Sequence, residues 1–101
     1  MYLKVRKLDE EVKFNEEKLQ AKILRDLGEQ KVLVFAIKKN QELPTHISPV
    51  DAMIFVIDGK IEFTADGKNY KLEKNNIFEF QKNLEHKVLG LEDSHFLVIR
   101  M

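Results

Sequence analysis

The chain contains no cysteine, only two prolines and no excess charge of either sign, with seventeen basic and seventeen acidic side chains. Without cysteine the protein has no disulfide framework, no thiolate metal site and no cysteine nucleophile, so burial of apolar side chains must stabilise the fold. Nearly every basic residue has an acidic neighbour, which argues against a nucleic-acid-binding surface. No apolar run approaches the length that spans a membrane, and charges interrupt residues 1–7, where a secretion signal would be apolar. We therefore expect a cytoplasmic protein with neither nucleic-acid nor membrane partners.

What the sequence does contain is a series of short apolar runs. Its 101 residues, 44% of them apolar, are enough for one core and too few for two. Residues 32–37, 53–57 and 96–99 are rich in β-branched and aromatic side chains and have the length of buried strands. Residues 60–64 alternate polar and apolar side chains, and residues 77–80 form another short apolar segment. These runs predict a single all-β domain.

Turn signals separate these segments. Asp58-Gly59 and Asp66-Gly67 are typical of two-residue type I′ hairpins, because both positions of such a turn need a positive φ. Asn75-Asn76 offers a further turn. Turns spaced about eight to ten residues apart indicate an antiparallel sandwich or barrel.

Residues 16–27 are ambiguous. Asn15 could cap a helix that ends at Gly28, and Leu19, Ile23 and Leu27 would then form a stripe at helical spacing. A strand through the same residues is also possible, and the local signals favour the helix.

Two histidine-containing segments carry a resemblance to a known family. His46 lies shortly before one apolar strand, and His86 lies forty residues further along, after the next hairpin. The layout resembles the two motifs of the cupin superfamily. In the first motif the matching positions are His46, Ser48, Ala52 and Gly59; in the second they are Asn75-Asn76, Gln81 and His86. The chain is especially similar to small cupins with a His-x-x-Pro-x-Asp-Ala segment, matched by His46, Pro49, Asp51 and Ala52.

The resemblance implies a double-stranded β-helix, the cupin jelly-roll barrel, as a single domain over residues 1–101. Residues 18–101 would form the conserved barrel and residues 1–17 an N-terminal strand and connection. It also implies a strand over residues 18–26, against the local preference for a helix. Because cupins commonly pair through an N-terminal strand, we expect a homodimer in which residues 2–5 join the partner's sheet.

In typical cupins two histidines, a glutamate and a late histidine hold a divalent metal. Here the resemblance retains only His46 and His86, since Ser48 and Ala52 occupy the other two positions. Two histidines alone make a weak site for zinc, nickel, iron or manganese. Asp51 or His95 could complete it, although strand alternation beside Ala52 predicts that Asp51 points outward.

Three functions remain open. The first is a cupin that binds a small molecule in a barrel pocket lined by His46, Ser48, Ile54, Phe78, Phe80 and His86. The second is a metal-dependent enzyme of the isomerase or dioxygenase type, with His46 and His86 as metal ligands. The third is a dimerising scaffold with a relic pocket. The sequence offers no independent catalytic motif, so no catalytic residue is predicted.

Overall fold

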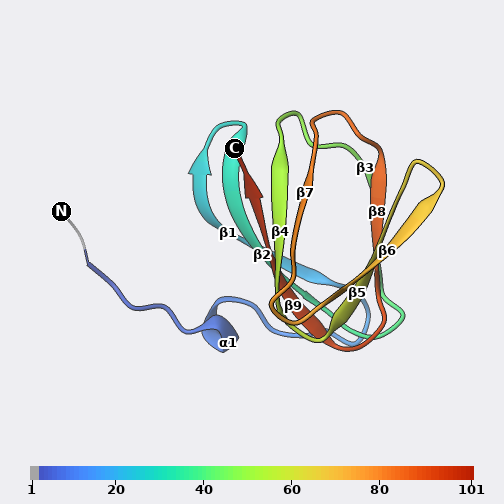
Figure 1. The fold of residues 1–101 in the computed structure, drawn as a ribbon. Helices are drawn as coiled ribbons and strands as arrows, with labels where there is room; N and C mark the ends of the chain where they lie inside the picture. Colours follow the sequence, from blue (N-terminus) through green and yellow to red (C-terminus); the bar gives the residue numbers. More distant parts are fainter. Residues whose placement is uncertain (1–2) are drawn as a thin grey trace.

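The computed structural model describes residues 3–101, which form two antiparallel β-sheets packed face to face (Figure 1). The elements are α1 (Leu8–Glu11), β1 (Gln20–Leu27), β2 (Gln30–Ile37), β3 (Glu42–His46), β4 (Ala52–Asp58), β5 (Lys60–Ala65), β6 (Lys68–Glu73), β7 (Ile77–Phe80), β8 (His86–Gly90) and β9 (Ser94–Arg100). The larger sheet has the order β1-β2-β9-β4-β7 and the smaller one the order β3-β8-β5-β6. The predicted all-β, single-domain fold is confirmed.

The apolar runs form the strands that the sequence predicted, with the main core between the sheets. In the larger sheet Ile54, Val56 and Phe96 are at most 1% exposed, and Ile61 and Phe63 of the smaller sheet are fully buried against them. A second cluster lies on the outer face of the larger sheet. It consists of Val12, Val34 and Ala36, with Leu8, Leu24, Ile57 and Leu97 packed around them.

Strand β1 confirms the strand that the family resemblance implied for this segment, against the local signals for a helix. It pairs antiparallel with β2 along its whole length, with one register shift between Ile23 and Arg25. As an edge strand it is mostly exposed, so its sequence lacks the alternation that identifies a half-buried strand. Pairing with the strongly β-forming residues of β2 decides its conformation, because tertiary context overrides weak local propensity.

The two Asp-Gly pairs make different turns. Asp66 and Gly67 have φ of 52° and 70° and join the paired strands β5 and β6, so the predicted type I′ hairpin is confirmed. The predicted hairpin at Asp58-Gly59 is wrong, because β4 and β5 belong to different sheets. Only Gly59 has a positive φ, 80°, and it carries the chain from one sheet to the other.

The N-terminal segment runs from the outer face of the larger sheet to the base of the barrel. Val12 is buried in the outer cluster, and the ring of Phe14 lies 4.6 Å from that of His95. Residues 3–7 form no strand within this chain, and Met1 and Tyr2 lie outside the described residues. The pairing of residues 2–5 with a second chain therefore stays a prediction.

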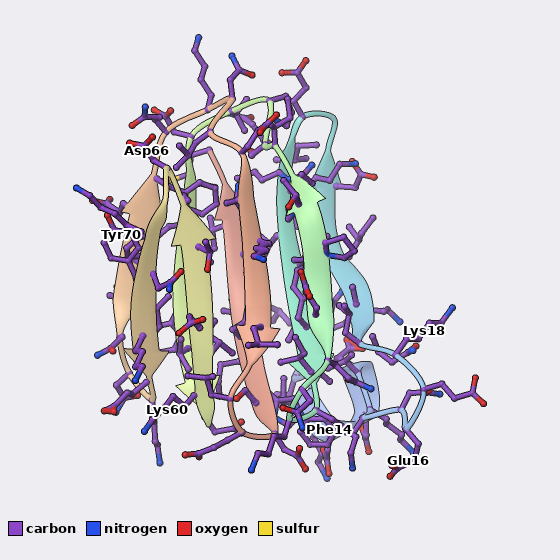
Figure 2. The ribbon with its side chains drawn as sticks, turned by 90° about the vertical axis from the view of Figure 1, so that its right-hand side faces the viewer. Phe14, Glu16, Lys18, Lys60, Asp66 and Tyr70 are labelled. Atoms are coloured by element: carbon purple, nitrogen blue, oxygen red, sulfur yellow. The ribbon has the colours of Figure 1, made fainter. Side chains whose placement is uncertain are left out.

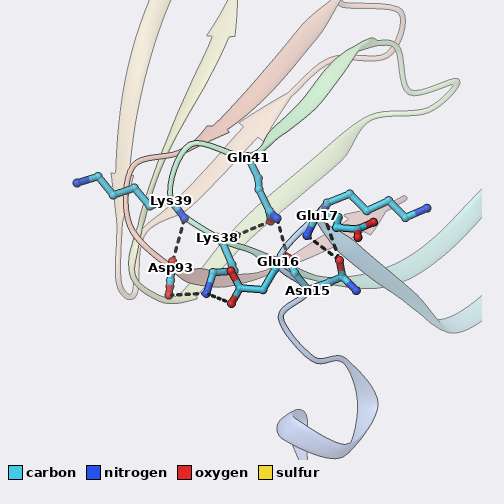
Figure 3. Close-up of polar contacts among 8 residues, drawn as sticks. Asn15, Glu16, Glu17, Lys38, Lys39, Gln41 and Asp93 are labelled. Carbon is cyan, nitrogen blue, oxygen red and sulfur yellow. Dashed lines mark hydrogen bonds and ion pairs between the residues drawn. The ribbon is translucent and has the colours of Figure 1, made fainter.

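Polar contacts fix the connection between this segment and β1 (Figure 3). The Asn15 carbonyl accepts a hydrogen bond from the Gln41 side chain at 2.7 Å, and the Lys38 ammonium lies 3.1 Å from a Glu16 carboxylate oxygen. The hydrogen bond and the charge of Glu16 raise the pKa of Lys38. Asp93 accepts a hydrogen bond from the Lys39 amide at 2.9 Å, which links the same region to the loop before β9. Within residues 3–101 no helix is long and apolar enough to cross a membrane.

Candidate functional site

A small cavity of about 30 Å³ lies between the two sheets. It is near the end of the barrel that carries Asp66, since His86 pairs with Ala65 there; Lys60 and Phe14 mark the opposite end in Figure 2. Its polar lining consists of His46, Ser48, His86 and Arg100, and its apolar lining of Leu33, Phe35, Leu43, Ile54, Phe80, Val88, Phe96 and Val98. A cavity of this volume holds one or two water molecules.

The two histidines lie side by side on the paired strands β3 and β8 of the smaller sheet, where they line the cavity. His46 ends β3, His86 begins β8, and the two residues pair across the strands with their ring centroids 4.2 Å apart. Each ring Nδ1 lies 2.8 Å from the backbone carbonyl two residues earlier, at Pro44 and Leu84 respectively. A carbonyl can only accept, so Nδ1 carries the proton in both rings. Each Nε2 is then a free acceptor, because no hydrogen bond to it is made by residues 3–101.

Local backbone features set these positions. Pro44 lies in β3, which is an edge strand, where a missing amide donor is tolerated. The pairing of β3 with β8 shifts register between Leu43 and His46, and this irregularity brings His46 opposite His86.

His86 is the more buried of the two histidines, with 4% of its surface exposed. Its ring stacks on Phe63 at 5.0 Å and lies 4.6 Å from that of Phe80. Burial lowers the pKa of His86, the Leu84 carbonyl opposes this, and the charges of His46 and Arg100 lower it further. His86 is therefore neutral at pH 7.

The other positions of the resemblance supply no metal ligand. Ser48 is buried, and its hydroxyl donates to the Val50 carbonyl and accepts from the Val50 amide. Ala52 faces inward with a methyl group only. Asp51 points outward, as strand alternation predicted, and accepts a hydrogen bond from the Lys82 amide at 2.9 Å. Among residues 3–101 no three histidine, cysteine or acidic side chains are close enough to share a metal ion.

His95 does not lie with the other two histidines. Its neighbours in β9, Ser94 and Phe96, are fully buried in the interior, so His95 faces the outer side of the sheet. There its Nδ1 lies 3.0 Å from both carboxylate oxygens of Asp58, and Phe14 covers the ring. The hypothesis that His95 completes a metal site with His46 and His86 is wrong, because the sheet separates them.

The apolar residues expected in the pocket, Ile54, Phe78 and Phe80, divide between two spaces. Ile54 and Phe80 line the small cavity, whereas Phe78 lines an outer cleft of about 250 Å³ together with Tyr70. Phe80 borders both spaces and a third cleft of about 330 Å³ near Asp51. His86 likewise borders both the cavity and a further cleft of about 320 Å³.

Arg100 is the site residue that sequence reasoning missed. It lies on β9 in the same alternation as Phe96 and Val98, and it pairs across the sheet with Ala52. The alternation from Phe96 could have placed it inside the barrel. The apolar run that predicts this strand, residues 96–99, ends one residue before it.

Two sheets closed around a histidine-lined cavity define a small β-barrel protein. The pattern of the Cupin domain family matches residues 33–100, and the chain belongs to that family. No curated protein matches the chain.

Solved structures agree with this assignment. A conserved protein of unknown function from Streptococcus pyogenes is 26% identical over 99% of this chain and 89% of its own, with a TM-score of 0.84. An RmlC-like cupin from Desulfovibrio desulfuricans is 25% identical over 96% of this chain and 94% of its own, with a TM-score of 0.83. A cupin superfamily protein from Desulfitobacterium hafniense, 14% identical over 93% of this chain and 86% of its own, has a TM-score of 0.86 and supports the fold alone.

Proposed function

We propose that this cupin is a binding protein that takes a polar group of a small molecule into its barrel cavity without a metal ion. The observation that carries the proposal is the matched orientation of His46 and His86. Both rings are held by a backbone carbonyl at Nδ1, and both keep Nε2 as a free acceptor beside the same cavity. Two fixed acceptors in an apolar surround favour a ligand that donates hydrogen bonds, such as a hydroxyl or amide group.

The donor set does not fit the divalent metal that the family resemblance suggested. A stable protein site needs about three ligands, and the cavity offers two imidazoles. The Ser48 hydroxyl is engaged by Val50, and Ala52 has no donor atom. The remaining polar side chain is the guanidinium of Arg100, whose positive charge repels a cation. These features favour hydrogen bonding over metal-dependent catalysis.

The volume of the cavity limits what can enter. About 30 Å³ accommodates only a few heavy atoms, so a very small molecule or the polar end of a larger one can enter. A larger ligand would extend into an outer cleft. Phe80 and His86 each border both the cavity and such a cleft, so these two side chains limit the size of the ligand.

The test is an NMR titration that follows the Nε2 resonances of the three histidines. Ethylene glycol, acetamide and glycolate serve as probes at constant ionic strength and pH 7. We expect saturable shifts of Nε2 in His46 and His86. His95 is the internal control, because it lies outside the barrel and its Nε2 should not move.

Two results would overturn the proposal. One is that no probe shifts His46 or His86 more than His95. The other is that the purified protein takes up close to one equivalent of zinc, nickel, iron or manganese and loses it on His86→Phe substitution, which would show that a metal occupies the cavity.

A further inference from the structure

Arg100 lines the cavity with a partly exposed side chain. Its Nε is buried and has no hydrogen-bond partner. Among residues 3–101 no carboxylate lies within ion-pair distance of its guanidinium, whereas Arg6 and several lysines of the same range contact carboxylates.

The unpaired Nε is unfavourable in the free protein, because a buried donor without an acceptor has lost its hydrogen bonds to water and gained none in return. Buried polar atoms are satisfied in most proteins, so an orphaned one inside a cavity points to an acceptor that arrives from outside.

The residues around Arg100 indicate which kind of acceptor its guanidinium would bind. Ala52, opposite Arg100 in the sheet, leaves space and contributes no charge. A carboxylate is planar, matches the fork of the guanidinium and has only three heavy atoms, which suits a cavity of about 30 Å³. The Nε2 acceptors of His46 and His86 would repel a second carboxylate but can accept a hydrogen bond from a hydroxyl group.

We propose that Arg100 binds the carboxylate of a small hydroxy acid, whose hydroxyl group donates to the histidine pair. This inference rests on the proposed function, because it assigns the chemical class of the molecule that enters the same cavity. Arg100 supplies the charge recognition, and His46 and His86 supply acceptors for the neutral end of the ligand.

The experiment compares glycolate with ethylene glycol in the full chain, by calorimetry and by the same NMR titration. Arg100→Met keeps the length of the side chain but removes the charge and the donors, whereas Arg100→Lys keeps the charge without the fork. Arg25→Met is the matched control, since Arg25 is an exposed arginine on β1. We expect Arg100→Met to weaken glycolate binding about tenfold or more, the effect of losing a charge-assisted hydrogen bond. Arg100→Lys should lose less, and Arg25→Met should remain within about twofold of the unmodified chain.

The outcomes separate the two proposals. If ethylene glycol shifts His46 and His86 while glycolate binds no more tightly than ethylene glycol, the inference on Arg100 is overturned and the proposed function stands. If neither probe binds, both fail. Equal binding of inorganic phosphate and glycolate would refute the carboxylate assignment. Circular dichroism of Arg100→Met and Arg100→Lys establishes that both variants fold; if Arg100→Met does not, unchanged glycolate binding by Arg100→Lys overturns the inference.

Discussion

Replacing Gly59 by alanine tests how the chain crosses from one sheet to the other. Gly59 has a φ of 80°, and a Cβ added there would lie 2.1 Å from the Ser94 hydroxyl and 2.4 Å from the Asp93 carbonyl. Such distances are far below van der Waals contact, so the backbone must shift.

The cost has two parts. An L-residue in the left-handed region costs about 1–2 kcal/mol. The Ser94 hydroxyl accepts from the Lys60 amide at 2.8 Å and donates its one proton to the Glu92 carbonyl at 2.8 Å, with the Lys60 carbonyl 3.1 Å away. Displacing this fully buried side chain leaves groups unsatisfied, which adds about 1–3 kcal/mol. We expect Gly59→Ala to lower the free energy of unfolding by about 2–5 kcal/mol, a large part of the stability of a small domain.

Gly67→Ala is the matched control. Gly67 has a similar φ of 70°, but nothing lies within 4 Å of an added Cβ. It should therefore cost only the 1–2 kcal/mol of backbone strain. Urea unfolding of both variants, followed by circular dichroism, measures the difference. Equal losses in Gly59→Ala and Gly67→Ala would refute the argument from close approach.

Three further predictions concern other parts of the chain. Because burial depresses the pKa of His86, the unfolded chain binds its proton at a higher pH than the folded chain. Stability should then fall as the pH drops below about 6.5, by at most about 1.4 kcal/mol per pH unit, and His86→Gln should flatten this dependence in urea unfolding. Asp58→Ala should cost about 1–3 kcal/mol by the same assay, since the carboxylate accepts from the His95 amide at 2.9 Å and contacts its ring; an unchanged unfolding midpoint would contradict this. Removing residues 1–7 should convert the expected homodimer to a monomer in sedimentation velocity, and a truncated chain that stays dimeric would exclude pairing through that strand.

The parts of the fold that the sequence predicted are those with strong local signals. Residues 32–37 are apolar without interruption because both faces of β2 are covered, the inner one by the core and the outer one by Val12 and its neighbours. Edge strand β1 has no such coverage. The helix caps at Asn15 and Gly28 therefore predict a helix wrongly, and only the family resemblance predicts the strand.

The two identical Asp-Gly pairs show that the local sequence alone does not determine which turn forms. Both dipeptides tolerate a positive φ, but the turn that forms depends on whether the flanking strands pair with each other. β4 instead pairs with β7 and β9, which are distant in the sequence. No pattern near Asp58 carries that information.

The candidate site could also be predicted only in part from the sequence. His46 and His86 came from the resemblance, and the structure brings them together. Arg100 has no counterpart in the motifs and its role depends on its neighbour across the sheet, Ala52. His95 could not be placed because both faces of its strand are apolar.

The position of β9 in the larger sheet has a consequence for biosynthesis. The strand lies between β2 and β4, so these two strands have no shared partner until residues 94–100 have left the ribosome. Before that point the larger sheet exists only as separate β1-β2 and β4-β7 pairs, each too small to be stable alone. Closing the sheet requires contacts across a long loop, which is slow in proteins dominated by non-local pairing. The nascent chain should therefore remain sensitive to protease until β9 has been made, and the cavity, whose arginine lies on that strand, is the last part of the protein to form.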